Sequence, residues 1–369
     1  MTDPALGSEL GLAKKDLDTP ALLLDLDLFG ANVRRIAGTC QKAGINWRPH
    51  TKAIKTPALA HLLVKAGAIG VTCAKLGEAE VMAAAGIRDV LVANQVVGRV
   101  KVMRLANVQS RANVMVALDS SCNALEISNA AVTASTKVPV LIEVNTGQDR
   151  AGLEPGVATV AFAREVASLP GLILRGLMTW EAHAAKIAAV EEKARAVKAA
   201  LRVLAETADL CRQAGLPIEV VSCGGTATYA LSAACPGITE VQAGGGVFCD
   251  VHYRTHYGID HDYALTLLTT VSSRPTPTRV ICDAGKKAMS VDMAIPLPVG
   301  LEGVKSVRLN AEHTILELDR PNDRPQVGER LEFVIGYSDT TVHLHDDLYG
   351  VRNGIVEDVW RIEGRGKMR

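Results

Sequence analysis

Short apolar segments alternate with amphipathic helical segments over the first two thirds of this chain. Eight segments have a strand-like pattern, and they span residues 44–48, 69–73, 89–93, 113–118, 138–144, 172–178, 218–222 and 239–243. Because apolar strands separated by helices must be joined by crossover connections, the pattern predicts a parallel sheet covered by helices. Eight strand–helix units within about 200 residues are typical of a (β/α)8 barrel. A doubly wound open sheet is the alternative, but no Gly-x-Gly-x-x-Gly turn follows the first strand, which favours the barrel.

The pattern changes after about residue 264, where short strands are separated by Pro, Asn, Asp and Gly. The expected strands span residues 265–272, 278–282, 304–309, 314–318, 330–334 and 355–361. This composition predicts a mostly β domain. An early strand, 21–26, has no place in the barrel, so we expect it to join the β domain. The predicted organisation is a barrel over residues 27–264 and a β domain made of residues 1–26 and 265–369.

The composition excludes several classes of function. Hydrophobic residues make up 48% of the 369 residues and charged residues 22%, so a large core can form. The 40 basic and 40 acidic residues balance without long runs of one sign, which argues against nucleic-acid and membrane partners. The N-terminus lacks the apolar core of a signal peptide, and no apolar run reaches the roughly 18 residues of a membrane span. The eight cysteines are scattered, as is typical of reduced cysteines, and we expect a cytoplasmic protein.

Lys52 directly follows the first expected barrel strand, in the segment Arg48-Pro49-His50-Thr51-Lys52. Side chains at the carboxyl ends of barrel strands line the active face. A lysine in the barrel mouth is suited to form a Schiff base with a carbonyl group. The alternative, from position alone, is a solvated lysine at the start of a helix.

Two glycine clusters favour the catalytic interpretation of Lys52. Gly224-Gly225-Thr226 follows the seventh expected strand, and Gly244-Gly245-Gly246 follows the eighth. Each cluster alone could be an ordinary tight turn. Barrels often bind phosphate between the loops after these two strands. A lysine amine opposite a phosphate site is the minimal description of a pyridoxal phosphate site.

Five segments of the chain stand in the order expected of one enzyme family. They are Arg48-Pro49-His50-Thr51-Lys52, Gly147-Gln148-Asp149-Arg150-Ala151-Gly152, Ser222-Cys223-Gly224-Gly225-Thr226, Glu240-Val241-Gln242-Ala243-Gly244 and Asp283-Ala284-Gly285. The chain resembles the D-threonine aldolase / D-serine dehydratase family, within the alanine-racemase-like (fold type III) pyridoxal phosphate enzymes. The resemblance extends from about Thr19 to Gly366. It implies a barrel plus a β domain, a homodimer whose sites use both subunits, and a small amino acid of D configuration as substrate.

The resemblance also implies roles for individual residues. Lys52 would carry the cofactor, and Arg150 would reach its phenol oxygen. The full set of cofactor-binding candidates is Lys52, Arg150, Trp180, Ser222, Gly224, Gly225, Thr226, Gln242, Gly244 and Gly245. In the same family a divalent metal (Mn, Mg or Zn) is bound by a His-x-Asp or His-x-Cys pair in the C-terminal domain.

Two positions depart from the family pattern. Asp339 matches the second metal ligand, but Tyr337 replaces the histidine, and a lone carboxylate with a phenol is a poor divalent site. Glu181 occupies the position of the histidine that handles the substrate hydroxyl proton. In one interpretation, Glu181, His183 and Asp339 rebuild a metal or acid–base site. In the other, the metal is lost and Tyr337 is an acid–base residue. Glu181 could also be a carboxylate that is only hydrogen-bonded in the barrel mouth.

Three other histidines have less specific signals. Alternation on a strand would place His343 and His345 on one face, which suits a metal. We nevertheless expect structural or dimer-interface roles for this pair, because the resemblance places them past the usual ligands. His50 is expected to pack beneath Lys52.

The first hypothesis is a lyase that cleaves a β-hydroxy-D-amino acid to glycine, or a related amino acid, and an aldehyde. Its catalytic candidates are Lys52, Glu181 and Tyr337. The alternatives that keep the cofactor are dehydration of a 3-hydroxy-D-amino acid, and racemisation by Lys52 and Tyr337 on opposite faces of the substrate. A non-catalytic pyridoxal phosphate carrier is a third hypothesis, but a carrier needs no second domain to shape a substrate pocket.

Overall fold

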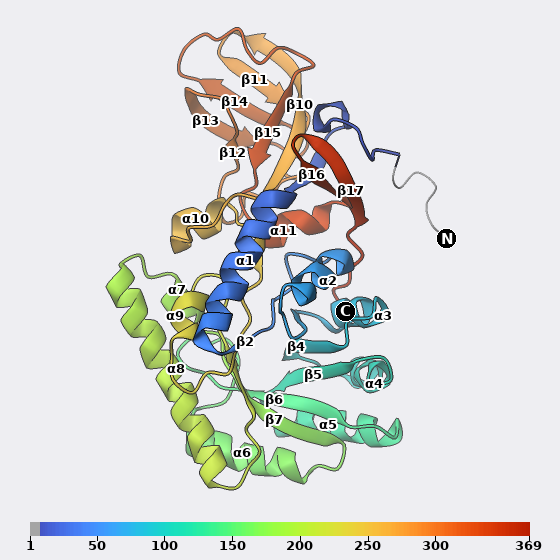
Figure 1. Ribbon diagram of the computed structural model, residues 1–369, viewed down its shortest axis with the longest axis vertical. Helices are drawn as coiled ribbons and strands as arrows, with labels where there is room; N and C mark the ends of the chain where they lie inside the picture. Colours follow the sequence, from blue (N-terminus) through green and yellow to red (C-terminus); the bar gives the residue numbers. More distant parts are fainter. Residues whose placement is uncertain (1–7) are drawn as a thin grey trace. The chain divides into compact units, whose positions relative to one another are not determined.

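A computed structural model describes residues 8–369 of the chain (Figure 1). Backbone contacts divide the chain into two compact units. The first unit contains the residues up to Val33 together with Gly245–Arg365, and the second contains Arg34–Gly244 and Gly366–Arg369. No helix among the described residues is both long and apolar enough to cross a membrane.

The second unit is a parallel (β/α)8 barrel (Figure 1). Its strands are β2 (Asn46–Trp47), β3 (Val71–Cys73), β4 (Asp89–Gln95), β5 (Asn113–Leu118), β6 (Val138–Glu143), β7 (Leu172–Met178), β8 (Val220–Cys223) and β9 (Glu240–Val241). Their spatial order is β2-β9-β8-β7-β6-β5-β4-β3, with parallel pairing throughout. A parallel bridge between His50 and Thr72 joins the two ends and closes the barrel. The predicted barrel is confirmed.

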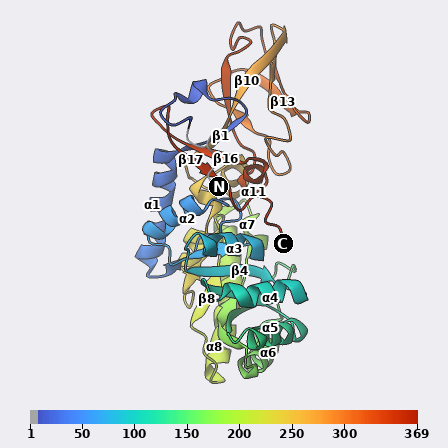
Figure 2. The ribbon, with the colours of Figure 1, turned by 90° about the vertical axis from the view of Figure 1, so that its right-hand side faces the viewer.

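Helices cover the outside of the barrel because each has one apolar face. They are α2 (Pro57–Lys65), α3 (Leu76–Ala84), α4 (Arg99–Val108), α5 (Ser121–Thr133), α6 (Val157–Ser168), α7 (Ala182–Ala185), α8 (Val190–Gln213) and α9 (Tyr229–Ala233). Figure 2 shows α3, α4, α5 and α6 in sequence along one side of the sheet. Helix α1 (Leu26–Ala43) begins in the first unit and ends in the second.

The barrel core explains why its strands are so apolar. All six residues of β6 are buried, and Leu91, Met115, Ala117, Leu141 and Met178 form one buried cluster from neighbouring strands. Full burial of such a side chain contributes about 1.5–3 kcal/mol to stability. Both faces of each strand are covered, so apolar residues are needed at nearly every position.

The first unit is mostly β. Its strands are β1 (Ala21–Asp25), β10 (Leu265–Thr276), β11 (Arg279–Cys282), β12 (Leu297–Pro298), β13 (Val304–Leu309), β14 (Thr314–Leu318), β15 (Arg330–Val334), β16 (Asp347–Arg352) and β17 (Ile355–Arg361). Strand β1 pairs antiparallel with β10 and parallel with β16, as expected for an early strand that joins this sheet. The short helical segments are η1 (Lys14–Asp16), η2 (Gly245–Val247), α10 (Val251–Tyr257), α11 (Ser338–Thr341) and η3 (Val342–Leu344).

Three details differ from the sequence predictions. Strands β12 and β16 were not predicted, and residues 245–264 group with the β unit. His343 lies in the 3-10 helix η3 and His345 follows it, so the expected strand alternation of the two rings is wrong. The helical turn α11 continues directly into η3, so the chain is not extended at His343. The ring of His345 instead bonds the backbone oxygen of Ala288 through Nε2 at 2.8 Å.

Candidate active site

Lys52 lies in the turn that follows β2, where the barrel closes. The backbone N–H of Thr51 donates to the backbone oxygen of Thr72 at 2.6 Å, so the turn continues the seam between β2 and β3. The N–H of Lys52 donates to Nδ1 of His50 at 3.3 Å. His50 therefore lies next to Lys52 and supports its backbone, and the lysine is held at the carboxyl end of its strand.

A buried ion pair that was not predicted holds the same turn. Lys55 and Glu78 are 5% and 2% exposed, and the Lys55 ammonium donates to the Glu78 carboxylate. Glu78 also accepts the backbone N–H groups of Ala74 and Lys75, at 2.8 and 3.1 Å. The pair therefore ties the turn after β2 to the start of α3. The only sequence signal was a lysine three positions after Lys52, which has no distinctive pattern.

The two glycine loops need glycine because other groups approach them closely. Gly224 has a φ of +75°, in the region that favours glycine. A Cβ on Gly225 would lie 2.7 Å from the ring of Trp180, and a Cβ on Gly244 would lie 1.9 Å from the backbone oxygen of His50. Trp180 and the loop after β8 are thus in contact, as are the loop after β9 and the segment that carries Lys52. Gly245 is the first residue of the other unit, and a Cβ there would lie 2.5 Å from the hydroxyl of Tyr253.

Ser222 and Gln242 lie inside the barrel, in a polar network that the sequence did not predict. The Ser222 hydroxyl donates to Glu240 at 2.8 Å and accepts from Gln242 at 3.0 Å. Arg48 donates through Nε to the same Glu240 carboxylate at 2.9 Å and through a second nitrogen to Asp89. Burial opposes the charge of Arg48, but Glu240 and Asp89 outweigh it and raise its pKa. This network crosses the barrel beneath the glycine loops.

Arg150 is exposed in the loop after β6 and lies 3.4 Å from the buried carboxylate of Glu143. Glu143 also accepts from the side-chain amide of Gln95 at 2.6 Å. The same amide reaches Asp119 at 3.1 Å. Ends of three neighbouring strands thus carry a polar cluster at the barrel mouth, with Arg150 at its solvent side.

Glu181 is completely buried, and both of its oxygens accept hydrogen bonds from the segment after β8. This geometry supports the alternative of a hydrogen-bonded carboxylate and not the predicted base. His183, two residues later, packs against the neighbouring loop: its Nε2 would lie 3.2 Å from a Cβ on Gly147. The two side chains thus contact different loops: Glu181 contacts the segment after β8, and His183 contacts the loop after β6.

In the first unit, Tyr337 and Asp339 lie together after β15. The Tyr337 hydroxyl donates to Asp339 at 2.7 Å. Burial, and then the charge of Asp339, raise the pKa of Tyr337, so the phenol keeps its proton at neutral pH. Asp250 fixes the same turn, because it accepts the backbone N–H of Ser338 at 2.8 Å and its hydroxyl at 2.7 Å.

His252 is a residue near Tyr337 that the sequence analysis missed. It is 4% exposed, and neither ring nitrogen has a hydrogen-bond partner within residues 8–369. Its ring lies edge-on to Tyr337, with 5.2 Å between centroids, and 4.8 Å from the ring of His256. Burial, and then the charge of His256, lower the pKa of His252. The sequence analysis did not identify His252 because it lies in α10, between the family motifs that end at Gly244 and begin again at Asp283.

The residues fit pyridoxal phosphate better than a metal ion. A lysine amine and two close-packed glycine loops at the ends of neighbouring strands match an aldehyde and a phosphate. The Tyr337–Asp339 pair does not fit a divalent cation, because a protonated phenol and a single carboxylate supply too few anionic ligands. Within the described part of the chain, no three His, Cys, Asp or Glu side chains gather in a way that could hold a metal.

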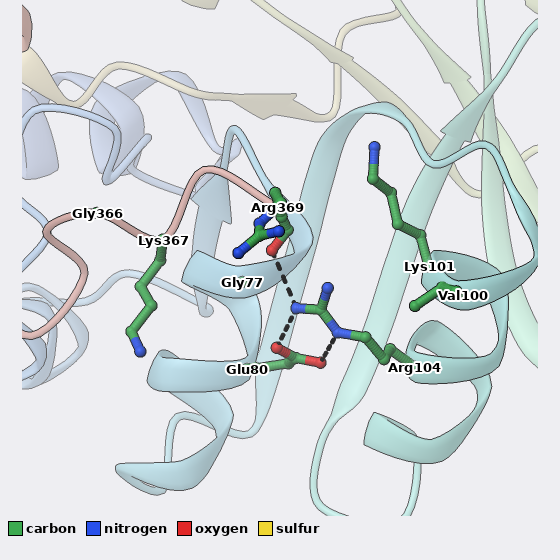
Figure 3. A pocket seen from close by; sticks show the side chains of 8 residues that line it. All are labelled: Gly77, Glu80, Val100, Lys101, Arg104, Gly366, Lys367 and Arg369. Atoms are coloured by element: carbon green, nitrogen blue, oxygen red, sulfur yellow. Dashed lines mark hydrogen bonds and ion pairs between the residues drawn. The ribbon is translucent and has the colours of Figure 1, made fainter.

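A separate hollow of about 490 Å³ lies on the outside of the barrel, away from the predicted site residues (Figure 3). Its lining comes from α3, α4 and the final segment of the chain: Gly77, Glu80, Val100, Lys101, Arg104, Gly366, Lys367 and Arg369. Arg104 binds Glu80 through two hydrogen bonds of 2.8 and 2.6 Å and donates to the backbone oxygen of Arg369 at 2.9 Å (Figure 3). These contacts fasten the final residues to the barrel.

Comparison with known protein families gives two matches along the chain. Residues 24–251 match the alanine racemase N-terminal domain, and residues 264–351 match a putative serine dehydratase domain. The two matches together cover the barrel, most of the β unit, and every site residue predicted from the sequence.

Individual relatives are similar over nearly the whole chain. A D-threonine aldolase of Arthrobacter sp. is 35% identical, over 96% of this chain and 94% of its own. A 3-hydroxy-D-aspartate aldolase of Paracoccus denitrificans is 34% identical, over 97% and 94%. The crystal structure of D-threonine aldolase from Filomicrobium marinum superposes with a TM-score of 0.93 at 34% identity, covering 97% of this chain and 98% of that one. A D-threo-3-hydroxyaspartate dehydratase of Delftia is more distant, at 31% identity over 75% of this chain and 73% of its own.

Proposed function

This chain belongs to the alanine-racemase-like family that includes the D-threonine aldolases, and we propose on that premise that it cleaves a β-hydroxy-D-amino acid. The products would be glycine, or a related amino acid, and an aldehyde. Pyridoxal phosphate is the cofactor that the family implies. The relatives at 34–35% identity over nearly the full length are aldolases, whereas the dehydratase structure from Delftia matches over a similar length with lower identity, 27%, and a lower TM-score, 0.84 against 0.93, which favours the lyase.

One observation carries the proposal. Lys52 follows β2 at the barrel seam, and the glycine loops follow β8 and β9, which are the next strands around the same barrel. Gly244 packs on the backbone of His50, two residues before Lys52. The segment that carries Lys52 and the second glycine loop are therefore in direct backbone contact.

The chain's own residues have distinct tasks in this proposal. Bound pyridoxal phosphate would supply an electron sink for the pair released when the Cα–Cβ bond breaks. Lys52 would hold the aldehyde end of the cofactor, and the backbone of Gly224–Thr226 and Gly244 would bind the phosphate. Trp180 would limit the space above Gly225. Arg150, balanced by Glu143, would offer its guanidinium to the phenol oxygen.

The state of Tyr337 bears on the choice between a lyase and a racemase. A racemase needs a second residue that can accept a proton from Cα. Burial and the charge of Asp339 raise the pKa of Tyr337, and its hydroxyl donates to Asp339 at 2.7 Å. Racemisation with Tyr337 as the proton acceptor would have to break this hydrogen bond, which makes it the less favoured alternative.

The test is a near-visible absorbance spectrum of the purified protein, with aldehyde release measured on D-threonine and on 3-hydroxy-D-aspartate. A Schiff-base band that changes with substrate, together with aldehyde and glycine as products, is expected. A protein without the band, to which added pyridoxal phosphate restores none, would overturn the cofactor assignment. A keto acid in place of the aldehyde would indicate a dehydratase.

The metal question is tested in the same assay with EDTA. Because the Tyr337–Asp339 pair does not fit a cation, we expect aldehyde release to continue after EDTA treatment and dialysis. Loss of release that Mn²⁺, Mg²⁺ or Zn²⁺ restores would mean that another set of residues binds a metal.

We also propose that the enzyme is a cytoplasmic homodimer. Light scattering at micromolar concentration tests the dimer, and a monomeric mass would contradict it. Fractionation of the source cells tests the compartment.

A further inference from the structure

Glu181 sits where the chain leaves β7, as the residue before the short helix α7. Its side chain is 0% exposed. Oε2 accepts the backbone N–H of Gly224 at 3.2 Å, and Oε1 accepts the hydroxyls of Thr228 and Ser232, both at 2.7 Å. All three donors belong to one stretch of nine residues, so the carboxylate joins the end of β7 to the loop after β8.

The three bonds determine the conformation of the glycine loop. Gly224 has a left-handed φ of +75°, and its N–H is held by Glu181 in that conformation. The hydroxyl of Thr228 in turn lies 3.4 Å from the N–H of Gly225. Two successive loop amides are therefore positioned by Glu181, one directly and one through Thr228.

Trp180 holds the loop from a different direction. A Cβ on Gly225 would lie 2.7 Å from its ring, so the indole is in close contact with the loop backbone. Neighbouring residues of one segment, an aromatic ring and a carboxylate, thus restrict the same glycines. A loop fixed by two independent contacts presents its remaining donors to a ligand without reordering.

The same bonds argue against Glu181 as a general base. A base must bring a free lone pair within about 3 Å of the proton that it accepts. Both oxygens of Glu181 are occupied by donors, and none of the side chain is accessible. To reach a substrate it would have to break three hydrogen bonds and leave three buried donors unsatisfied, which is unfavourable.

We propose that Glu181 is a positioning residue, which shapes the Gly224–Thr226 loop to bind the cofactor phosphate, and that it takes no proton from the substrate. The inference rests on the proposed function, because it assumes that this loop binds the phosphate of pyridoxal phosphate. In this chain Glu181 stands in place of the histidine of the family pattern, and its carboxylate holds the Gly224–Thr226 loop.

The main variant is Glu181→Gln, which keeps the shape but replaces one acceptor oxygen with an NH2 group. The new NH2 group would face either the Gly224 N–H or the hydroxyls of Thr228 and Ser232, so a donor would meet a donor. We expect the equilibrium Kd for pyridoxal phosphate, measured by absorbance titration of apoprotein, to rise about 10-fold, which corresponds to about 1.4 kcal/mol. The kcat at saturating cofactor, and its pH profile, should change less than about threefold.

Thr228→Val and Ser232→Ala are the matched variants, because each removes one donor to the same carboxylate and neither can be a base. Both should raise the Kd for pyridoxal phosphate in the same direction by a smaller factor, with kcat retained. If Glu181→Gln fails to fold, these two variants carry the test. Unchanged cofactor affinity in both would then overturn the proposal.

A loss of kcat of about 100-fold or more in Glu181→Gln, with unchanged cofactor affinity, would identify Glu181 as the base and sink the proposal. Amide hydrogen exchange of residues 224–232 in the apoprotein gives a readout that needs no cofactor. Faster exchange in Glu181→Gln supports the loop role even if the wild-type protein binds no pyridoxal phosphate, an outcome that refutes only the proposed function. Unchanged exchange in that segment refutes the loop role itself.

Discussion

Two buried carboxylates, one in each unit, have nearly the same surroundings. Glu181 in the barrel accepts one backbone N–H and two hydroxyls. Asp250 in the β unit accepts two backbone N–H groups, of Tyr253 and Ser338, and the hydroxyl of Ser338. Each carboxylate holds the turn beside a residue predicted to act in catalysis or cofactor binding: Gly224 for Glu181, and Tyr337 for Asp250.

The two differ in what the sequence suggested. Glu181 was a catalytic candidate because of its position in a family motif, whereas Asp250 drew no attention because it lies outside the motifs. The structure gives both the same local task. A family position identifies where chemistry happens, but the donors around a side chain decide whether that side chain performs it.

The largest expected effect comes from replacing Lys52, the lysine proposed to bind the cofactor in the barrel. Lys52→Ala should abolish the near-visible Schiff-base band and lower kcat by about 1000-fold or more, because the other amine in the turn after β2, that of Lys55, is held in a buried ion pair with Glu78. Lys55→Met is the matched control: it should keep the band and instead lower the melting temperature, since Glu78 loses its buried partner. Absorbance spectra of both variants measure the band, and calorimetry measures the melting temperature. A band that survives in Lys52→Ala would move the cofactor to another lysine.

The second effect tests whether Asp250 is the counterpart of Glu181. Asp250→Ala leaves three buried donors without an acceptor and should lower the free energy of unfolding by about 2–4 kcal/mol, measured by denaturant titration. Its affinity for pyridoxal phosphate should stay within about twofold of wild type, unlike that of the Glu181 variants. A large loss of cofactor affinity in Asp250→Ala would show that the effect of Asp250 is not confined to the turn that it holds.

A smaller effect is expected from Tyr337→Phe. The phenol donates to Asp339 and keeps its proton, so its removal should reduce aldehyde release by less than about 10-fold. Aldehyde release and solvent-proton exchange at Cα should be measured side by side. Loss of the exchange by about 100-fold or more would restore Tyr337 as an acid–base residue and favour racemisation.

The smallest effect is a pH dependence of stability that comes from His252. Burial lowers the pKa of His252 in the folded protein below the ordinary histidine value of about 6.5, so as the pH falls the unfolded chain binds a proton before the folded protein does. Stability is therefore present above about pH 6.5 and is lost as the pH falls toward the lower folded pKa. The groups that act on His252 are His256, Asp339 and Asp292. Denaturant titrations between pH 5 and 8 give the free energy of unfolding at each pH. This free energy should change less with pH in His252→Gln than in the wild type, and an equal pH dependence in both would contradict this assignment.

Much of the fold could be predicted from the sequence because the signals were local. Strands β5, β13, β14, β15 and β17 have the predicted bounds. Strands β12 and β16 were missed: the first has only two residues, and the second, Asp347–Arg352, mixes apolar and charged positions. A short or mixed strand is specified by its partners, which a single sequence does not display.

The site divides in the same way. Lys52 and the glycine loops could be found because a strand end and a glycine cluster are visible in sequence. The roles of Ser222 and Glu181 could not, because they depend on partners such as Glu240 and Thr228 that lie 18 and 47 positions away. Lys55 and Glu78 escaped notice for the same reason, since only folding brings them together.

The contact between Gly244 and the backbone of His50 leaves no room for a side chain at position 244. A Cβ there would lie 1.9 Å from the His50 oxygen, and the backbone N–H of His50 donates to the Gln242 oxygen at 3.0 Å, which joins the segment before Lys52 to the second glycine loop. In the proposed site, the spacing between the Lys52 segment and the loop that would bind the phosphate is therefore set by the protein's own packing. Binding of pyridoxal phosphate should therefore require little rearrangement of the chain and cost little conformational entropy. The site would select a ligand by the distance between its aldehyde and its phosphate as much as by its charge.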